Sequence, residues 1–317
     1  MKTLVTSILI SLFAFVFAQD AAYPRTVTDG SGNAVTISAK PKRIAVIDPL
    51  WSLEALLSLG VAPVQVGQRS FFADYLGDPL KQWPWLEEAL AKAGATPDRI
   101  NADETNIEGI AKVQPDLIVG HSGWVNDYRD LLDQIAPTIS VDTTDARVAI
   151  TLLGEVLAME EEAAQVIADW EVRIKNEVEG LVPAGKKVAI IRTDGDGKFA
   201  SFATPGYGPY DMLTRAGFTV PEELAKAELN YYGTASEFSF ERLDVLDEAD
   251  VIVVLGFSPD FTDTMLEHPL FLRLPAVQAG RVVRVEQGPI AQAFAALSPL
   301  NLDIVLPVIK EAAAHAQ

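Results

Sequence analysis

The sequence predicts an α/β protein in which two lobes are joined by a single long helix. Three observations support this fold class. In the first half, short apolar runs typical of strands buried in a parallel sheet alternate with helical patterns. A much longer helical pattern then interrupts this alternation at residues 160–181. After it, strands and helices begin again in a similar order, although no close sequence repeat relates the two halves.

The first half is expected to begin with a β-hairpin, because two alternating segments flank the glycine-rich turn at residues 30–33. A buried strand at residues 43–48 leads into a helix at 51–59. That helix is expected to end at Gly60, since glycine is favoured just beyond a helix end. The other elements expected here are strands at 64–67, 116–120 and 138–141, and helices at 107–113, 126–135 and about 145–159.

The long helical pattern has the features of a brace between two lobes. Acidic residues crowd its first turn, where they favour the positive end of the helix dipole. About 22 residues of helix span ~33 Å, the breadth of a small domain. Its apolar residues recur at helical spacing and are expected to face the lobes. They are Ala163, Val166, Ile167, Trp170, Ile174 and Val178.

The second half is expected to repeat the α/β plan. Residues 194–198, Asp-Gly-Asp-Gly-Lys, resemble a calcium loop, but Phe199 occupies the position that needs glycine and no glutamate stands at position 12. We therefore interpret this segment as a hairpin turn. The expected strands are 187–192, 250–255 and 281–285, and the expected helices are 209–216, 240–246 and 298–314.

The composition excludes several classes of function. The 317 residues carry 44 acidic and 25 basic side chains, a net charge of −19 that would repel a nucleic-acid backbone. Cysteine is absent, which excludes disulfides, thiolate metal sites, cysteine nucleophiles and a lipid anchor on cysteine. The three histidines are far apart in the sequence, so we expect no metal site.

Residues 1–18 have the pattern of a secretory signal peptide. Lys2 precedes an apolar run, and Val16-Phe-Ala18 places small residues at positions −3 and −1 of a cleavable bond. The alternative is an N-terminal membrane anchor, but the run is shorter than the ~20 residues of a spanning helix. Cleavage after Ala18 would remove one lysine and leave a net charge of −20. We expect a soluble, exported protein.

No catalytic motif is present. The sequence lacks a G-x-S-x-G elbow and a P-loop, and Gly206-Tyr-Gly208 lacks the pattern of a dinucleotide loop. The nearest nucleophile–base pair is Ser122 beside His121. Neighbouring residues on an extended segment point to opposite faces, so they would form a poor dyad. We therefore expect no enzyme. The alternative function from another class is an exported α/β hydrolase.

Polar and aromatic residues gather just beyond the predicted strands. In open α/β sheets, ligands bind outside the carboxyl ends of the strands. Arginine there can pair with carboxylate, hydroxamate or catecholate oxygens and can stack on rings. The alternatives are ordinary packing for the aromatic residues and surface salt bridges for the arginines; Trp83 and Trp85, in an expected loop around Pro84, are assigned a structural role. The candidate ligand-binding residues are Trp51, Arg69, His121, Trp124, Arg192, Tyr207, Tyr231, Tyr232 and Phe257.

Eight short motifs, weak singly, recur in a characteristic order and spacing. They lie at residues 27–30, 41–46, 106–119, 135–138, 239–243, 249–253, 269–271 and 274–282. In this order they resemble the exported substrate-binding proteins of ABC importers for iron–siderophore complexes, relatives of the cobalamin and haem binders. The resemblance covers nearly all of the chain after residue 18. It implies the fold of a class III periplasmic binding protein, with two Rossmann-like lobes bridged by a single long rigid helix.

The resemblance also implies a function. The chain would be a periplasmic protein without a lipid anchor, a monomer that captures a ferric siderophore between its lobes and delivers it to an ABC permease in the inner membrane. It would need no cofactor and no metal ligand of its own, because the chelator coordinates the iron. Haem or cobalamin is the alternative ligand, with His121 as an axial ligand for haem.

The family's permease-docking residues are one glutamate on each lobe. By motif they correspond to Glu108, in Asn-Ile-Glu, and Glu241, in Ser-Phe-Glu. The alternative is that both are ordinary solvated glutamates. The expected organisation is a signal peptide at residues 1–18, an N-terminal lobe at 24–158, a linking helix at 159–182 and a C-terminal lobe at 183–317.

Overall fold

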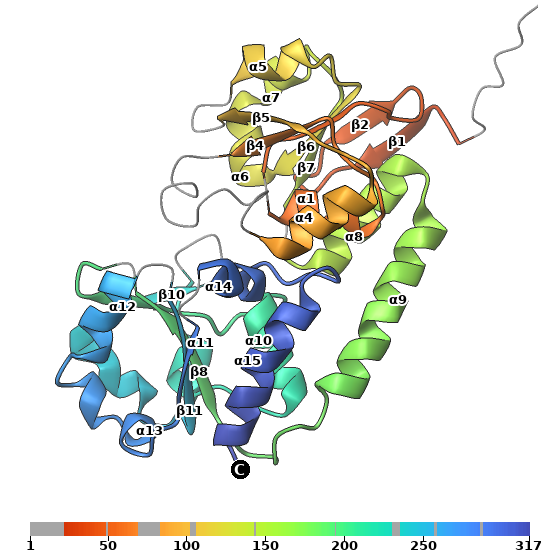
Figure 1. Ribbon diagram of the computed structural model, residues 1–317. Coiled ribbons are helices and arrows are strands. Elements are labelled where there is room, and N and C mark those ends of the chain that lie inside the picture. Colours follow the sequence, from red (N-terminus) through yellow and green to blue (C-terminus); the bar gives the residue numbers. More distant parts are fainter. Residues whose placement is uncertain are drawn as a thin grey trace, which may run out of the picture.

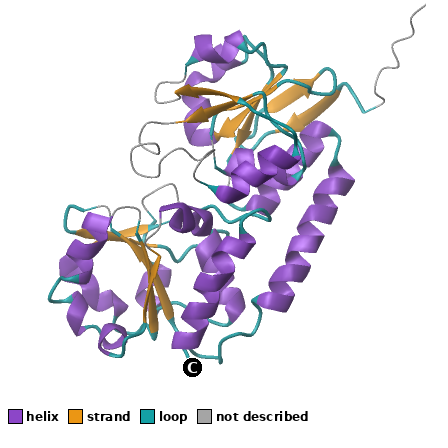
Figure 2. Cartoon of the chain, in the orientation of Figure 1, coloured by secondary structure: helices purple, strands orange, loops and turns teal. Residues whose placement is uncertain are grey.

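The computed structural model describes residues 22–48, 50–68, 83–101, 106–142, 144–193, 195–229, 235–256, 259–285 and 288–317. It confirms the α/β class and the two lobes. Figure 1 shows the first lobe above the second, with helix α9 (Glu160–Glu177) running along one side of both. Each lobe contains a sheet with helices around it (Figure 2). None of the helices in the described ranges has the length and apolarity needed to cross a bilayer.

The first lobe is built on a parallel sheet with the strand order β5-β4-β3-β6-β7. Every residue of β3, β6 and β7 is buried, as expected for strands covered on both faces. The predicted hairpin is confirmed as an antiparallel pair that lies beside this sheet. The strands are β1 (Arg25–Thr28), β2 (Ala34–Ile37), β3 (Ile44–Val46), β4 (Gln65–Gln68), β5 (Asp98–Asn101), β6 (Leu117–His121) and β7 (Thr138–Val141).

The helices of the first lobe differ from the prediction in two places. The single helix expected at 126–135 is instead three consecutive short helical segments from Ser122 to Leu132. Pro84, expected in a loop, begins a helix, because proline is tolerated at the first helical position. The helices are α1 (Trp51–Ser58), α4 (Pro84–Lys92), α5 (Ile107–Lys112), α6 (Ser122–Val125), η1 (Asn126–Tyr128), α7 (Arg129–Leu132) and α8 (Ala146–Leu157).

The sheet of the second lobe is mixed, with the strand order β10-β9-β8-β11-β12. The three predicted strands are its parallel part, and two unpredicted strands add an antiparallel edge. The predicted hairpin turn lies between β8 and β9, and Gly195, Asp196 and Gly197 all have positive φ. The strands are β8 (Val188–Arg192), β9 (Lys198–Ser201), β10 (Ser236–Ser239), β11 (Val251–Leu255) and β12 (Val282–Val285).

The helices of the second lobe include the three that the sequence predicts. The last one begins at Leu302 and not at residue 298, because residues 298–301 form a loop in which the Asn301 side chain accepts the N–H of Ser298 and donates to Ala296 O. The helices are α10 (Gly208–Ala216), α11 (Glu222–Lys226), η2 (Phe240–Leu246), α12 (Pro259–Leu266), η3 (Phe271–Arg273), α13 (Pro275–Gln278), α14 (Gly288–Ala295) and α15 (Leu302–His315).

Helix α9 is shorter than the helical pattern that predicted it. It has 18 residues and ends at Glu177, so the expected extension to residue 181 is wrong. The backbone turns there because Gly180 adopts a positive φ, and Val182 then donates its N–H to Ala216 O of the second lobe. The predicted inward stripe is confirmed, since Ala163, Trp170, Ile174 and Val178 are buried and Val166 and Ile167 pack half-buried against the same core.

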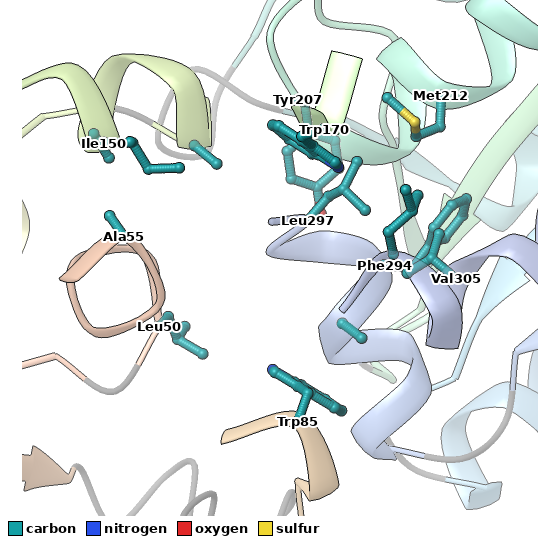
Figure 3. Packing of buried hydrophobic residues seen from close by; sticks show 14 of the residues in the cluster. Leu50, Ala55, Trp85, Ile150, Trp170, Tyr207, Met212, Phe294, Leu297 and Val305 are labelled. Atoms are coloured by element: carbon teal, nitrogen blue, oxygen red, sulfur yellow. The ribbon is translucent and has the colours of Figure 1, made fainter. Parts of the chain in front are cut away.

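One hydrophobic core runs through both lobes. The largest cluster of buried side chains includes α1, α4 and α8 of the first lobe together with α10, α14 and α15 of the second. Figure 3 shows Leu50, Ala55 and Trp85 on the first-lobe side of this core and Phe294 and Leu297 on the second-lobe side. Because this core is shared, the two lobes are packed together along one side.

Candidate functional site

A buried carboxylate organises the carboxyl end of the first sheet. Asp48, directly after β3, is fully buried, and its Oδ1 accepts the N–H groups of Leu50 (3.1 Å) and Ser52 (3.2 Å) at the start of α1. Its Oδ2 accepts the N–H of His121 at the end of β6 (2.8 Å). Asp48 therefore fixes the positions of two predicted site residues, Trp51 and His121, relative to each other.

The rings of Trp51 and His121 lie together at this sheet edge. Their centroids are 4.7 Å apart with the ring planes tilted by 42°. The N–H of Gly123 donates to Nδ1 of His121 (3.3 Å), which assigns the ring proton of the neutral form to Nε2. Burial lowers the pKa of His121, although the charges of Asp48 and Asp142 act to raise it. The buried, neutral imidazole and the half-buried indole thus form an aromatic pair at this sheet edge.

Ser122 and His121 do not form a catalytic pair through the serine hydroxyl. Ser122 Oγ donates to Asp142 Oδ1 at 2.5 Å, and His121 Nδ1 accepts from the backbone of Gly123. This arrangement gives no support to a hydrolase. Trp124, also predicted for the site, is 6% exposed and packs in a peripheral cluster of the first lobe with Ile47 and Ile110.

The second lobe carries a column of three side chains near the end of β8. The guanidinium of Arg192, the last residue of β8, lies 5.5 Å from the ring centroid of Phe202. Phe202 stacks on Tyr207 with centroids 4.9 Å apart and planes within 19°. Burial raises the pKa of Tyr207, against the opposing charge of Arg192, so the phenol stays neutral. The structure thus brings Arg192 and Tyr207 together through Phe202, which the sequence analysis did not single out.

Four predicted site residues lie outside the described residues: Arg69, Tyr231, Tyr232 and Phe257. The described strands end close to two of them in the sequence. β4 ends at Gln68, one residue before Arg69, and β11 ends at Leu255, two residues before Phe257. The assignment of these four residues to a ligand site stays a prediction.

Glu108 and Glu241 are both exposed, in the first turns of α5 and η2. Asn106 caps α5 by accepting the N–H of Gly109 at 2.8 Å. Each element is anchored by buried neighbours in a peripheral cluster of its own lobe, Ile110 in the first and Phe240 in the second. Within the described ranges neither glutamate takes part in an ion pair. Each lobe thus presents one solvated carboxylate on a firmly packed support.

A small cavity lies where α8, α9 and α10 meet, lined by Arg147, Trp170 and Asp211 among others. Its volume is about 10 Å³, room for about one water, whereas small-molecule sites enclose roughly 300–1,000 Å³. Arg147 bonds to Glu171 at 2.8 Å, and Arg215 of the second lobe bonds to the same carboxylate at 2.6 Å. This region joins the helices of both lobes and is too small to hold a chelate.

Comparisons with known proteins agree with this architecture. The family model described as "Periplasmic binding protein" matches residues 65–288. A probable siderophore-binding lipoprotein of Bacillus subtilis, YfiY, is 27% identical over 277 residues, covering 83% of this chain and 80% of the relative. The ferric enterobactin-binding periplasmic protein FepB of Escherichia coli is 28% identical over 296 residues, covering 88% of both chains. The crystal structure of PiaA from Streptococcus pneumoniae with ferrichrome matches with a TM-score of 0.75 at 25% identity, covering 92% of this chain and 99% of PiaA.

Proposed function

The chain belongs to the periplasmic binding protein family, and from this premise we propose that it captures a ferric siderophore between its lobes for delivery to an ABC permease. The observation that carries the proposal is the similarity over most of the chain to siderophore-binding relatives. It is a transport protein and no catalytic step is assigned to it. We propose that the permease lies in the inner membrane and that the protein acts as a monomer.

The ligand class follows from the chemistry at the two strand ends. In the first lobe, Trp51 and His121 offer aromatic surface. In the second, Arg192 offers a cation backed by the rings of Phe202 and Tyr207. A ferric siderophore combines an apolar shell with anionic oxygens, which suit these two surfaces. The chelator already fills the coordination sphere of the iron, so the protein contributes no metal ligand.

The proposed organisation keeps the boundaries that the sequence predicts. A signal peptide at residues 1–18 precedes lobes at 24–158 and 183–317, with a linking segment at 159–182 between them that contains helix α9. The shared core and α9 favour a small closure over a wide hinge motion. Because the sequence contains no cysteine, we propose a periplasmic protein without the lipid anchor of lipoproteins such as YfiY.

Tryptophan fluorescence tests the ligand class. Titration with ferric hydroxamates, ferric citrate and ferric catecholates is expected to give saturable quenching by one of them, because Trp51 lies at the proposed site. Arg192→Ala should weaken that binding by roughly 10–100-fold, the loss of one charge-assisted contact. Arg173→Ala, on the exposed side of α9 where Arg173 pairs with Asp303, is the matched control and should bind normally. Binding of haem or cobalamin with no response to any ferric chelate would contradict the proposal.

We further propose that Glu108 and Glu241 are the docking residues for the permease. Their support is their exposure, their position on opposite lobes and the rigid helical turns that carry them. Exposed ion pairs contribute only ~0–1 kcal/mol each. Two carboxylates at a fixed separation would therefore act mainly by orienting and steering the complex.

A further inference from the structure

A carboxyl group is buried where the two lobes pack together. Glu54 lies in the middle of α1, a helix of the first lobe that packs into the shared core, and is 2% exposed. Its Oε1 accepts the indole N–H of Trp85 on α4 at 3.0 Å. Its Oε2 accepts the side-chain amide of Asn301 at 2.9 Å and bonds to Ser298 Oγ, both in the second lobe. One carboxyl group thus joins the lobes; we call these four residues the Glu54 junction.

The second-lobe side of the junction is held rigidly in place. The N–H of Ser298 donates to Oδ1 of Asn301 at 3.0 Å, so the amide group of Asn301 must direct its nitrogen elsewhere. That nitrogen donates both to Ala296 O (2.9 Å) and to Glu54. Ser298 Oγ in turn accepts the N–H of Leu300 at 3.2 Å. The loop between α14 and α15 therefore presents two fixed polar groups to Glu54.

Among the residues that the structure describes, no cation balances the carboxyl group of Glu54. All three of its partners are neutral, and it has no ion pair with any described residue. Burial raises the pKa of Glu54 to about 8; hydrogen bonds from Ser298 and Trp85 act against that rise and the charge of Asp48 adds to it. A buried carboxyl without a counter-ion favours its neutral form.

The charged groups described on the surrounding elements do not neutralise the negative charge of an ionised Glu54. Asp48, before α1, carries the same sign and is held by backbone N–H groups. On α8, Arg147 is paired with Asp145 and Glu171. On α15, Asp303 is paired with Arg173. The carboxylates of Glu87 and Glu88 on α4 are exposed, and His121 on β6 lies against Trp51.

We propose that the Glu54 junction is a proton-dependent latch between the lobes: the neutral carboxyl group holds them together, and its ionisation loosens them. In the structure Ser298 Oγ donates to Oε2; in the neutral form this bond reverses, so that Glu54 donates its proton to Ser298 Oγ while it still accepts from Trp85 and Asn301. The ionised carboxylate would be buried among neutral hydrogen-bond donors without a counter-ion. Opening of the junction would let water solvate its charge. The latch depends on contacts within the chain and not on which ligand the protein carries.

The sign of the effect follows from linkage. Opening exposes Glu54 to water, where its pKa returns towards 4.5. Between pH 4.5 and about 8 the closed junction therefore holds a proton that the open junction has lost. Across this range the opening equilibrium should rise by up to about tenfold per pH unit, and above it the rise should stop.

Hydrogen exchange of the loop 296–301 measures this opening directly. Exchange of the peptide containing this loop is followed by mass spectrometry at pH 5.5, 6.5 and 7.5, and corrected for the intrinsic pH dependence of amide exchange. The wild-type loop is expected to lose protection by up to about tenfold per pH unit. A peptide covering β7, in the core of the first sheet, is the internal reference and should show no such change. A corrected protection of the wild-type loop that does not vary with pH would overturn the proposal.

Variants separate the proton from the packing. Glu54→Gln keeps a carbonyl for the indole N–H of Trp85 and an N–H donor for Ser298 Oγ, although it loses the oxygen that accepts from Asn301. Because it cannot ionise, its loop protection should be independent of pH. Glu87→Gln makes the same change at an exposed position of α4 and should retain the wild-type slope. A wild-type slope in Glu54→Gln would show that another group is responsible. If Glu54→Gln does not fold, the wild-type profile decides the question alone.

Discussion

Replacing both Glu108 and Glu241 by alanine is expected to abolish delivery of the ligand while leaving ligand capture unchanged. Each glutamate is exposed and lies in a first helical turn of its own lobe, and neither belongs to the Trp51–His121 or the Arg192–Phe202 ring contact. Removing both carboxylates removes the electrostatic steering of the encounter with the permease. It also removes the two contacts that fix the docking orientation. Each single variant should retain part of the uptake, since one lobe can still dock.

Uptake of ⁵⁵Fe-labelled chelate by cells that express the cognate permease measures delivery, and fluorescence quenching measures capture. The double variant should reduce uptake by at least about tenfold, because electrostatic steering raises association rates by roughly 10–1,000-fold and both steering carboxylates are lost. Glu87→Ala combined with Glu267→Ala removes one exposed glutamate from each lobe and is the matched control. Normal uptake in the Glu108/Glu241 double variant would reject the docking assignment.

Asp29→Ala is expected to cause a large decrease in the free energy of unfolding. Asp29 follows the first strand of the hairpin and forms a 2.5 Å ion pair with Arg129, with side-chain exposures of 0% and 14%. Its oxygens also accept the N–H groups of Ser31, Asn33 and Ser140. Removing one partner of a buried pair leaves the other charge uncompensated, which costs about 3–5 kcal/mol. Urea unfolding should show this loss; a change below 1 kcal/mol would show that the hairpin does not depend on the pair.

Asp29 and Glu54 should give the stability of the protein opposite dependences on pH. Burial acts to raise the pKa of Asp29, but hydrogen bonds from Asn33, Arg129 and Ser140 and the charge of Arg129 together lower it below its usual 3.8. Its contribution is therefore present above pH 3.8 and lost as the pH falls further. The pKa of Glu54 is raised from 4.5 to about 8, so its contribution is complete below pH 4.5 and lost as the pH rises to about 8.

We therefore expect the free energy of unfolding to be highest in mildly acidic solution. Urea unfolding between pH 3 and pH 9 should show the decrease on the alkaline side for the wild type and its absence in Glu54→Gln. The decrease on the acid side should be smaller in Asp29→Ala, which lacks the carboxylate that must be protonated. A Glu54→Gln protein that loses stability towards pH 8 as steeply as the wild type would contradict the assignment of this dependence to Glu54.

The central parallel strands were predictable because burial on both faces gives them continuous apolar sequences. The runs at residues 43–48, 116–120 and 250–255 show this pattern, and each overlaps a strand of the structure. The edge strand β5 was not predicted, because its sequence Asp-Arg-Ile-Asn is not an apolar run. Strands β9 and β10 escaped prediction because they form the antiparallel edge of their sheet and expose part of one face, which breaks up the apolar run. The end of α9 was misjudged because the apolar spacing continues to Val178, while contacts with the second lobe turn the backbone earlier.

The candidate site was predictable only where topology brings strand ends together. Trp51 and His121 follow different strands, yet the parallel sheet places them in contact. Asp48 holds both residues in place. The only sequence feature that marked Asp48 was its position after a buried strand. The Glu54 junction gave no signal, because Ser298 and Asn301 are 244 and 247 residues away in the sequence and α1 by itself has the pattern of an ordinary apolar helix.

Native mass spectrometry tests the central claim most directly. The protein is purified under non-denaturing conditions from iron-starved cells that express it, so that a captured ligand stays bound. We predict one added mass per chain that corresponds to an iron-loaded chelator and is absent from the Arg192→Ala protein. A bound haem or cobalamin, or a mass without ligand that also fails to take up any ferric chelate added afterwards, would contradict the account.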